Sequence, residues 1–439
     1  MQQKQKQKSG TGLVWFRNDL RVTDQLSLVK ACEHTKTIAV YCLDPSLFKK
    51  SSFGFTKMGK YRAKFLLESL VDLKAQLKAL NIPLFVVLES PETYIPALVS
   101  KHHITTIYLQ KEWTKEEVDS LKQVKEQLTE NVTLYESYSQ FLFHPDDIPY
   151  PNFDTIPNVF TAFRKKCEKY ATVRRPISEC SPKDHSNYFI TENNQIPTLK
   201  DLGYSDFEPN LNTAFPFSGG STAAKERIAH YFYKTENLAH YKETRNGLLG
   251  IDYSSKLSAW LANGSISAVE IYWEIQKFEK SVIKNQSTYW LFFELVWRDY
   301  FKYASLKYND RLFYLSGFMD RTYDWHLNDR KKQQWIDGNT PDAFVNANMI
   351  ELAKTGWMSN RGRQNVASYW SKTWQQDWRI GAAYFEEQLI DYDVHSNWGN
   401  WQYVSGIGND PRNRKFNTKL QAERYDPQNT YQNLWLHEN

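Results

Sequence analysis

Cysteine is scarce in this 439-residue sequence, which has 4 cysteines and no CxxC spacing between them. That spacing indicates neither a zinc site nor a disulfide framework. No apolar run approaches the ~18 residues of a membrane span, and the first ten residues, MQQKQKQKSG, lack the apolar core of a signal peptide. We therefore expect a cytoplasmic protein of bacterial type, with an organellar location as the alternative, and no contact with a membrane.

The motifs of common nucleotide and hydrolase sites are missing as well. The sequence has no GxGxxG after a predicted strand, no GxxxxGK[ST] and no GxSxG. A single His among two Asp in residues 391–403 lacks the spacing of a metal site, and we expect no metal. Because no residue stands in the context of a nucleophile, we expect a bound cofactor to carry the chemistry.

Aromatic residues, in contrast, are abundant and unevenly placed. They make up 15% of the chain, and only Trp15 and Trp113 of the 15 tryptophans precede residue 250. Two interpretations stay open: aromatic packing in a large helical core, or a flat aromatic ligand, stacked bases or electron transfer. The net charge of +5 hints weakly at a polyanion, and basic residues are densest at 411–424, where a solvated loop is the alternative.

The hydrophobic pattern divides the chain into three parts. Short apolar runs alternate with amphipathic segments over residues 11–137, which predicts an α/β domain with a doubly wound parallel sheet. Residues 138–220 are rich in Pro, Asn, Ser and Asp and predict a long loop-rich connector. Residues 221–439 predict an all-α domain.

The expected elements follow the same pattern. Strands are expected at Leu13–Phe16, Thr37–Leu43, Pro83–Leu88, Thr105–Leu109 and Val132–Tyr135. Helices are expected at Lys57–Leu80, Pro91–Ser100, Lys115–Leu128, Val159–Tyr170, 222–240, 267–280, 285–308, 328–337, 340–355, 361–375 and 381–390.

Two segments of the helical domain could bind charged groups. On a helix over Ser287–Lys307, Glu294 falls in a stripe of aromatic side chains, where it either meets a ligand or pairs with Arg298 four residues on. Serines at 254, 255 and 258 precede a short apolar run. That arrangement suits either a phosphate at a helix start or simple N-capping.

Two further segments carry side chains that bind flat or polyanionic ligands. Residues 360–364 (NRGRQ) open a predicted helix with groups that read base edges or phosphates, and an exposed polar helix start is the alternative. Residues 391–403 (DYDVHSNWGNWQY) suit hydrogen bonds to the edge of a flat ligand, or else form an Asx-rich turn with no ligand.

The order of these motifs resembles the photolyase/cryptochrome family, and most closely its cryptochrome-DASH branch. The resemblance covers nearly the whole chain and rests on LVWFRNDLRVTD, YKETRNGLLGIDYSSKLSAWLANGSIS, STYWLFFELVWRDYF, TGWMSNRGRQNVASYW and LIDYDVHSNWGNWQYVSGIGNDPR. It implies an N-terminal antenna domain and a helical FAD-binding catalytic domain. By motif, the FAD-binding residues would be Tyr241, Ser254, Ser255, Leu257, Ser258, Arg298, Asn360, Arg363, Asp391, Asp393 and Asn397, the last facing the flavin N5.

The resemblance further implies light-dependent repair of cyclobutane pyrimidine dimers by a deoxyribodipyrimidine photo-lyase type of enzyme. Residues toward the lesion would be Glu294, Trp297, Arg361, Gln364 and Tyr403, and the electron-transfer chain would be Trp401, Trp378 and Trp325. Gln364 and Tyr403 stand where standard bacterial repair enzymes have methionine and tryptophan. A more polar, less stacking pocket gains less from extruding a paired dimer, so we predict a preference for single-stranded DNA.

A second chromophore, 5,10-methenyltetrahydrofolate, is implied for the antenna domain, with Glu112 at its pterin ring and helix capping by Glu112 as the alternative. The expected partner is DNA that contains pyrimidine dimers, and the expected state is a monomer. Two other functions stay open. One is a blue-light photoreceptor with little or no repair activity, and the other is a flavin reductase or nucleic-acid-binding module without light chemistry.

Overall fold

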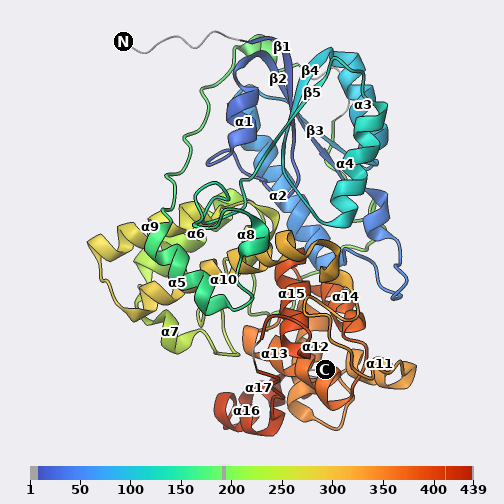
Figure 1. The fold of residues 1–439 in the computed structure, drawn as a ribbon, viewed down its shortest axis with the longest axis vertical. Coiled ribbons are helices and arrows are strands. Elements are labelled where there is room, and N and C mark those ends of the chain that lie inside the picture. The colour runs from blue at the N-terminus through green and yellow to red at the C-terminus, as the bar shows by residue number, and fades with distance from the viewer. Residues whose placement is uncertain (1–7, 190–193, 411, 438–439) are drawn as a thin grey trace.

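An α/β domain forms one end of the molecule and a helical domain forms the other (Figure 1). The computed structural model describes residues 8–189, 194–410 and 412–437, so the first residues of the N-terminal tail and Pro411 of the basic segment lie outside it. Within the described residues the sheet has five parallel strands in the order β3-β2-β1-β4-β5. These strands are β1 (Lys8–Trp15), β2 (His34–Cys42), β3 (Leu84–Val87), β4 (Ile104–Gln110) and β5 (Thr133–Ser137). The predicted doubly wound parallel sheet is confirmed.

Helices cover both faces of the sheet, which explains why its strands are continuous apolar runs. Alternate residues of β1 enter opposite cores: Val14 packs with α1 (Leu26–Ala31) and α2 (Lys60–Ala79), whereas Leu13 packs with α3 (Pro91–His102) and α4 (Lys115–Gln127). Helix α1 was not expected, because its six residues are too few for a periodic pattern to be recognised.

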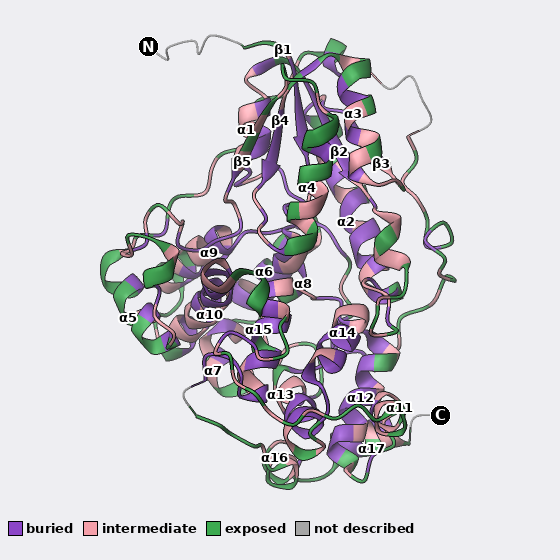
Figure 2. Cartoon of the chain, turned by 45° about the vertical axis from the view of Figure 1, so that its right-hand side comes forward, coloured by how far each residue is buried: buried purple, intermediate pink, exposed green. Residues whose placement is uncertain are grey.

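The helical domain is built around the long helix α10 (Gln286–Tyr308), and about half of the residues of this helix are buried (Figure 2). Its helices are α6 (Ser221–Ile228), α7 (Tyr241–Thr244), α8 (Ser258–Asn263), α9 (Ala268–Ser281), α10 (Gln286–Tyr308), α11 (Asp329–Ile336), α12 (Ala343–Thr355), α13 (Asn360–Ser368), α14 (Trp378–Gln388), α15 (Val394–Ser405), α16 (Thr418–Tyr425) and α17 (Thr430–Leu436). The connector before it contains α5 (Phe160–Tyr170) and short 3₁₀ turns. No helix in the described part of the chain is long and apolar enough to cross a membrane.

Three predicted elements of this domain are wrong in detail. The helix expected over 222–240 ends at Ile228 and continues as a π-helical stretch and, after Glu236 with a φ of +52°, as a 3₁₀ turn. The helix expected over 361–375 changes to a π-helix at Tyr369. The helix expected over 381–390 begins at Trp378, because the Asp377 side chain accepts a hydrogen bond from the backbone of the second helical residue.

The segment 391–403 is not an Asx-rich turn. Its larger part is helix α15, and the Asp393 side chain caps that helix by accepting from the Ser396 backbone N–H at 2.8 Å. The segment contains polar residues typical of turns, but the helix packs against α10 and α14, and this tertiary contact decides its conformation.

Candidate flavin site and interdomain cavity

Two adjoining cavities of about 260 and 100 Å³ lie inside the helical domain. They share a polar wall made by Asn360, Arg363, Asp391, Asp393 and Ser396, which come from α13 and from the start of α15. The larger cavity also reaches α7, α8 and α10, and the smaller one ends on aromatic and aliphatic side chains. The shape therefore combines one polar and one flat apolar end, as a ligand with a charged part and an aromatic ring requires.

The polar end of the larger cavity is lined by Tyr241, Ser254, Ser255, Leu257 and Ser258, together with Arg298 from α10. The serines do not cap α8: the residue before this helix is Leu257, and no side chain makes a cap hydrogen bond there. The simple N-capping interpretation of this motif is therefore wrong. Ser258 Oγ instead donates to Asp391 Oδ2 at 2.7 Å.

Arg227, which no sequence motif indicated, fixes the backbone of residues 251–255, which we call the serine turn. Its buried guanidinium donates to the carbonyl oxygens of Ile251, Ser254 and Ser255 at 3.0–3.1 Å and pairs with Asp252 at 2.6 Å. These four contacts leave the two serine hydroxyls on the cavity wall. Arg227 lies about 25 residues before the motif it supports, so no local pattern could have identified it.

Asp391 ties three elements together at the junction of the cavities. It accepts from Ser258 of α8, and its two carboxylate oxygens lie 2.9 and 3.0 Å from Arg363 Nη2 of α13. Arg363 Nε also donates to the Met358 carbonyl at 2.9 Å, which fixes the guanidinium. Both residues were expected among the contacts to a cofactor, and the structure brings them together.

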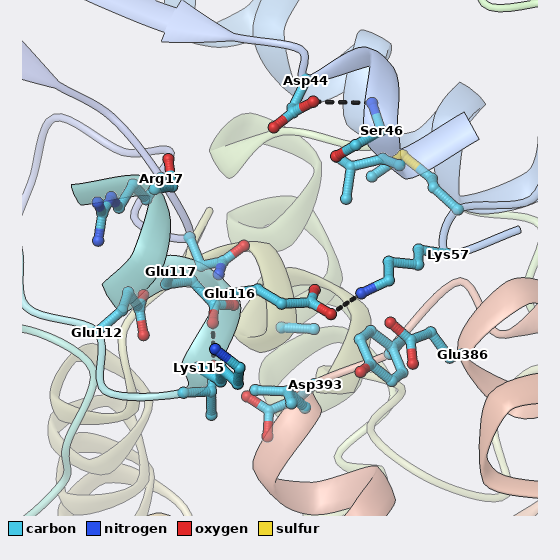
Figure 3. Close-up of a pocket in the computed structure, with 18 of the residues that line it drawn as sticks. Arg17, Asp44, Ser46, Lys57, Glu112, Lys115, Glu116, Glu117, Glu386 and Asp393 are labelled. Atoms are coloured by element: carbon cyan, nitrogen blue, oxygen red, sulfur yellow. Dashed lines mark hydrogen bonds and ion pairs between the residues drawn. The ribbon is translucent and has the colours of Figure 1, made fainter. Parts of the chain in front are cut away.

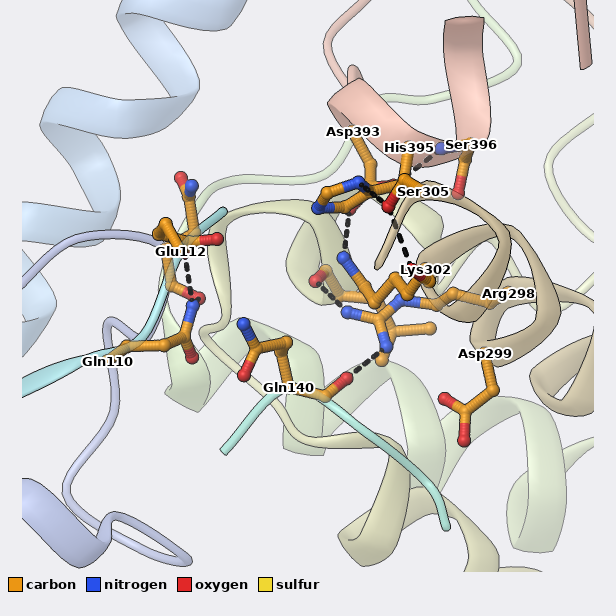
Figure 4. A network of polar contacts seen from close by, with 12 residues as sticks. Gln110, Glu112, Gln140, Arg298, Asp299, Lys302, Ser305, Asp393, His395 and Ser396 are labelled. Carbon is orange, nitrogen blue, oxygen red and sulfur yellow. Dashed lines mark hydrogen bonds and ion pairs between the residues drawn. The ribbon is translucent and has the colours of Figure 1, made fainter. Parts of the chain in front are cut away.

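A buried network connects Asp393 and His395 to Lys302 and Ser305 of α10 (Figure 4). Lys302 Nζ lies 2.8 Å from Asp393 Oδ2. Burial alone would raise the pKa of Asp393, but the positive charge of Lys302 outweighs it and the pKa falls well below its usual value. Burial and the same ammonium group lower the pKa of His395, so this ring is neutral.

The imidazole of His395 stacks on Trp113 of the α/β domain, with ring centroids 4.5 Å apart. Ser305 Oγ accepts from Trp113 Nε1 at 2.7 Å, donates to the Lys302 carbonyl at 2.8 Å and lies 2.8 Å from His395 Nδ1. Because its one proton goes to the carbonyl, the hydroxyl oxygen accepts from Nδ1–H. Trp113 thus anchors the α/β domain directly on α10 and α15 of the helical domain.

Asn397 and Trp401 lie on consecutive turns of α15 and line the smaller cavity. Asn397 Nδ2 donates to the Ala382 carbonyl at 3.0 Å, so its orientation is fixed by α14. Trp401 is buried against the same helix at Gly381, where a Cβ atom would lie 2.2 Å from the indole. The glycine is therefore required by the close approach of the ring.

Trp401, Trp378 and Trp325 belong to one aromatic cluster. Trp378 is fully buried at the start of α14, and Trp325 lies beside that start because His326 pairs with the backbone of Gln375 and Asp377 at 2.8–3.0 Å. Other indoles enter the same cluster, and Trp398 lies 5.6 Å from Trp378. The structure brings the predicted tryptophans together but surrounds them with further aromatic rings.

Glu294 lines the larger cavity and pairs with Arg245, not with Arg298. The i,i+4 interpretation of this carboxylate is therefore wrong: Arg298 instead donates to the carbonyl oxygens of Gln140 and Leu261 at 2.6 and 3.1 Å. Arg245 was missed because it lies 49 residues away, in the loop after α7.

Trp297 stacks on Phe160 of the connector helix α5, with centroids 3.6 Å apart, and meets Tyr403 edge-on at 5.7 Å. Arg361 Nη1 donates to the Gln364 side chain at 2.9 Å, and the Arg361 guanidinium lies over the ring of Tyr425 at 4.7 Å. The last contact brings the basic segment, residues 412–424, next to Arg361.

A third cavity, of about 570 Å³, lies between the two domains (Figure 3). The carboxyl ends of β1, β2 and β4 open into it, as expected for a ligand site of an open α/β sheet. Glu112 is buried on its wall, accepts from Gln110 Nε2 at 2.6 Å, and has a pKa raised to about 7 by burial. Helix capping by Glu112 is wrong, because α4 begins after Thr114.

The described residues contain no group of three or more His, Cys, Asp or Glu side chains that could hold a metal ion. The residues around the two inner cavities do fit a dinucleotide flavin. They supply hydroxyl and guanidinium groups at one end, paired carboxylate and amide groups in the middle, and a flat apolar wall at the other.

Comparison with known proteins defines the class. A family model described as DNA photolyase matches residues 12–183, and one described as FAD binding domain of DNA photolyase matches residues 290–439. The chain belongs to the photolyase/cryptochrome family, as the sequence motifs predicted.

The relatives within that family carry a more specific name. A protein of Gloeobacter violaceus named Cryptochrome DASH is 44% identical over 431 residues, which cover 98% of this chain and 86% of that protein. A protein of Arabidopsis thaliana named Cryptochrome DASH, chloroplastic/mitochondrial, is 42% identical and is covered to 75%, with 97% of this chain. The crystal structure of the Synechocystis sp. PCC6803 cryptochrome superposes with a TM-score of 0.91 at 40% identity, covering 98% of this chain and 89% of that one.

Proposed function

We propose that the protein repairs cyclobutane pyrimidine dimers in a light-dependent reaction, as a deoxyribodipyrimidine photo-lyase type of enzyme, and prefers lesions in single-stranded DNA. The observation that carries this proposal is the position of Glu294, a carboxylate on the wall of the larger inner cavity, three residues before Trp297 on α10; Trp297 in turn meets Tyr403 edge-on. Reduced FAD, when bound, would absorb blue or near-UV light and supply the electron that splits the dimer. The residues of the chain contribute geometry and charge.

The proposed FAD contacts follow the walls of the two inner cavities. Tyr241, Leu257, Arg298 and the three serines would hold the diphosphate and ribityl part, since they form the polar end. Asn360, Arg363, Asp391 and Asp393 would hold the polar edge of the flavin ring, and Asn397 would face its N5. Arg363 lies beside the buried carboxylate of Asp391 and Lys302 beside that of Asp393, so each buried negative charge has a positive partner.

The proposed lesion contacts lie next to this site. Glu294 would accept a hydrogen bond from a base edge, and its ion-pair partner Arg245 holds the carboxylate in place on the cavity wall. Trp297 would stack on the dimer, and Arg361 would reach a phosphate or a base. Gln364 is hydrogen-bonded to Arg361, and Tyr403 meets Trp297 edge-on rather than offering it a stacked face. Such a pocket gains little free energy from binding a flipped dimer, which supports the proposed preference for single-stranded DNA, where no base pair has to be opened.

Trp401, Trp378 and Trp325 would return electrons to the flavin from the protein surface. Trp401 lines the smaller inner cavity, Trp378 is fully buried in the same cluster, and Trp325 is partly exposed, so the proposed chain begins at the cavity and ends on a residue that solvent reaches. Replacing Trp401 by Phe should slow photoreduction of bound FAD, whereas a binding module without light chemistry would show no photoreduction to slow.

The interdomain cavity is the proposed site of 5,10-methenyltetrahydrofolate. Its size and the buried carboxyl of Glu112 support a planar heterocycle with donor groups, since a carboxyl bound only to Gln110 keeps free acceptor capacity. Glu112→Gln should lower the folate content of the purified protein and leave its FAD content unchanged.

The central experiment is a repair assay with purified protein, reduced FAD and a defined dimer in single-stranded and in duplex DNA. We expect light-dependent repair that is faster on the single strand. Glu294→Gln keeps the size of the side chain and should lower the repair yield with FAD still bound. Equal repair of both substrates would refute the strand preference, and no repair with full FAD occupancy would refute the enzyme.

A second candidate function is a light sensor that uses the same cofactor without repair. Two contacts favour it: Arg245 occupies Glu294, and Phe160 covers one face of Trp297, so groups that a lesion would use already have partners. Photoreduction would occur in both cases, and the repair assay separates them. We further propose a monomer that acts in the cytoplasm or in an organelle, which size-exclusion chromatography and imaging of a tagged full chain would test.

A further inference from the structure

Two cysteines from distant parts of the chain meet on the side of the α/β domain. Cys32 is the C-cap residue of α1, and Cys180 lies in the connector, 148 residues later. Both are free thiols and partly exposed, and Cys32 Sγ donates to Cys180 Sγ at 2.8 Å. This separation is within about 1 Å of an S–S bond length.

The connector is fixed to the domain on both sides of Cys180. Ile177 and Asp24 exchange two hydrogen bonds of 2.9 and 3.0 Å, one through the Asp24 backbone and one through its carboxylate. Lys183 N–H donates to the Leu80 carbonyl at 2.9 Å, and Asn81 Nδ2 donates to the Lys183 carbonyl at 2.8 Å. Cys180 is therefore held opposite Cys32 by anchors three residues away on either side, and the two sulfurs need to approach by less than about 1 Å to form a bond.

The surroundings distinguish the two thiols. Lys183 Nζ donates to the Cys32 carbonyl at 3.1 Å, which places an ammonium group beside the pair. The hydrogen bond from Cys32 and the charge of Lys183 hold the pKa of Cys180 below its usual value, although burial opposes this; the same hydrogen bond and burial raise the pKa of Cys32. Cys180 is thus the nucleophile of the pair and Cys32 the resolving thiol.

We propose that Cys32 and Cys180 are a reversible thiol–disulfide site, oxidised by a low-molecular-weight disulfide such as oxidised glutathione. The Cys180 thiolate attacks one sulfur of oxidised glutathione, whose S–S bond breaks and releases one glutathione thiolate. Cys32 then loses its proton to solvent and attacks Cys180 Sγ, forming the protein disulfide and releasing the second glutathione. Two thiols of the protein are oxidised and one glutathione disulfide is reduced to two thiols, so atoms and electrons balance.

The disulfide would fasten the connector to the α/β domain without entering the sites described above. Neither cysteine lines the two inner cavities or the interdomain cavity. Because the bond closes a loop of 148 residues, it should stabilise the folded protein, and we expect the melting temperature to rise by about 5 °C on oxidation. FAD content should not change.

The test is incubation of the purified full-length protein with oxidised glutathione, followed by non-reducing peptide mapping by mass spectrometry. We expect one cross-linked peptide pair, Cys32 with Cys180, that dithiothreitol removes. Cys32→Ser lacks the resolving thiol and should accumulate glutathione on Cys180. Cys180→Ser removes the thiol that raises the pKa of Cys32 most, but burial still raises it, so Cys32 should react with oxidised glutathione more slowly than Cys180 does in Cys32→Ser.

The other cysteines supply matched controls. Cys42→Ser and Cys167→Ser should form the cross-link at the rate of the unmodified protein, since neither contacts the pair. Persistent glutathione on Cys180 with Cys32 present, or two thiols that both stay free while a small thiol reagent still reaches them, would overturn the proposal. Cys32→Ser and Cys180→Ser must be folded for their reactivity to be compared. An absorption spectrum that shows bound FAD checks the folding of each variant.

Discussion

Gly381 offers the sharpest test of how the flavin-site helix α15 is held. A Cβ atom at this position would lie 2.2, 2.6 and 2.8 Å from three carbon atoms of the Trp401 six-membered ring. Ordinary carbon–carbon contacts are about 3.5–4.0 Å, so the ring would have to move by more than about 1 Å. Phe385 and Trp335 pack around Trp401 with centroids at 5.1 and 6.2 Å, and the indole has little room to retreat.

The expected magnitude follows from two opposing effects. Overpacking of a buried site costs about 1–3 kcal/mol, while replacing glycine inside a helix returns about 1 kcal/mol. The 2.2 Å contact puts this clash at the upper end of the overpacking range, so Gly381→Ala should lower the free energy of unfolding by about 2 kcal/mol in a denaturant titration. Since Trp401 lines the smaller cavity, photoreduction of bound FAD should slow as well.

A double-mutant cycle with Trp401→Phe separates this clash from other effects. Phenylalanine lacks the outer ring carbons that the new methyl group would meet, so Gly381→Ala should cost less in that background, by about 1 kcal/mol. An equal cost in both backgrounds would refute the reasoning, as would a Gly381→Ala protein that is as stable as the parent.

Three further predictions concern buried charges. Arg227→Ala leaves the carbonyls of the serine turn without their donor, and FAD affinity should fall about 10-fold or more in a fluorescence titration; unchanged affinity would exclude a positioning role. Lys302→Met removes the partner of Asp393, so burial should raise the pKa of this carboxyl, which a pH titration of FAD binding would detect as a new transition absent from the parent. Burial raises the pKa of Glu351 in α12 from 4.5 to about 7, so the folded protein holds this proton to a higher pH than the unfolded chain does. The free energy of unfolding therefore falls as the pH rises from 4.5 to 7, by up to about 3 kcal/mol. Glu351→Gln should remove this fall, and an unchanged pH profile of stability would contradict the assignment.

Local sequence signals predicted the elements whose burial pattern is simple. The strands of the α/β domain are buried on both faces, so their apolar runs were visible in the sequence, and α10 shows its periodicity over 23 residues. The failures lie where tertiary contacts override local preference. Helix α15 contains Asp, Ser, Asn and Gly, which favour turns, and forms because it packs against α10 and α14.

The flavin site shows the same division. The order of the sequence motifs predicted which residues contact the flavin, and several of these residues line the same two cavities. The partners that fix these residues could not be predicted from the sequence. They are Arg227 for the serine turn, Arg245 for Glu294 and Trp113 for His395. Each partner lies between about 25 and 282 residues from the group it contacts, and no spacing rule connects residues so far apart.

The sequence by itself determined the family and the two kinds of domain, and it supplied the residues that we propose to surround a flavin, because repeated local patterns and ordered motifs are properties of neighbouring residues. The tertiary structure alone decided which charges neutralise one another, which of the thirteen late tryptophans lie at the cavity, and that Cys32 and Cys180 touch. These are pairings across long sequence separations, and their energies depend on distance and burial, which exist only after the chain has folded.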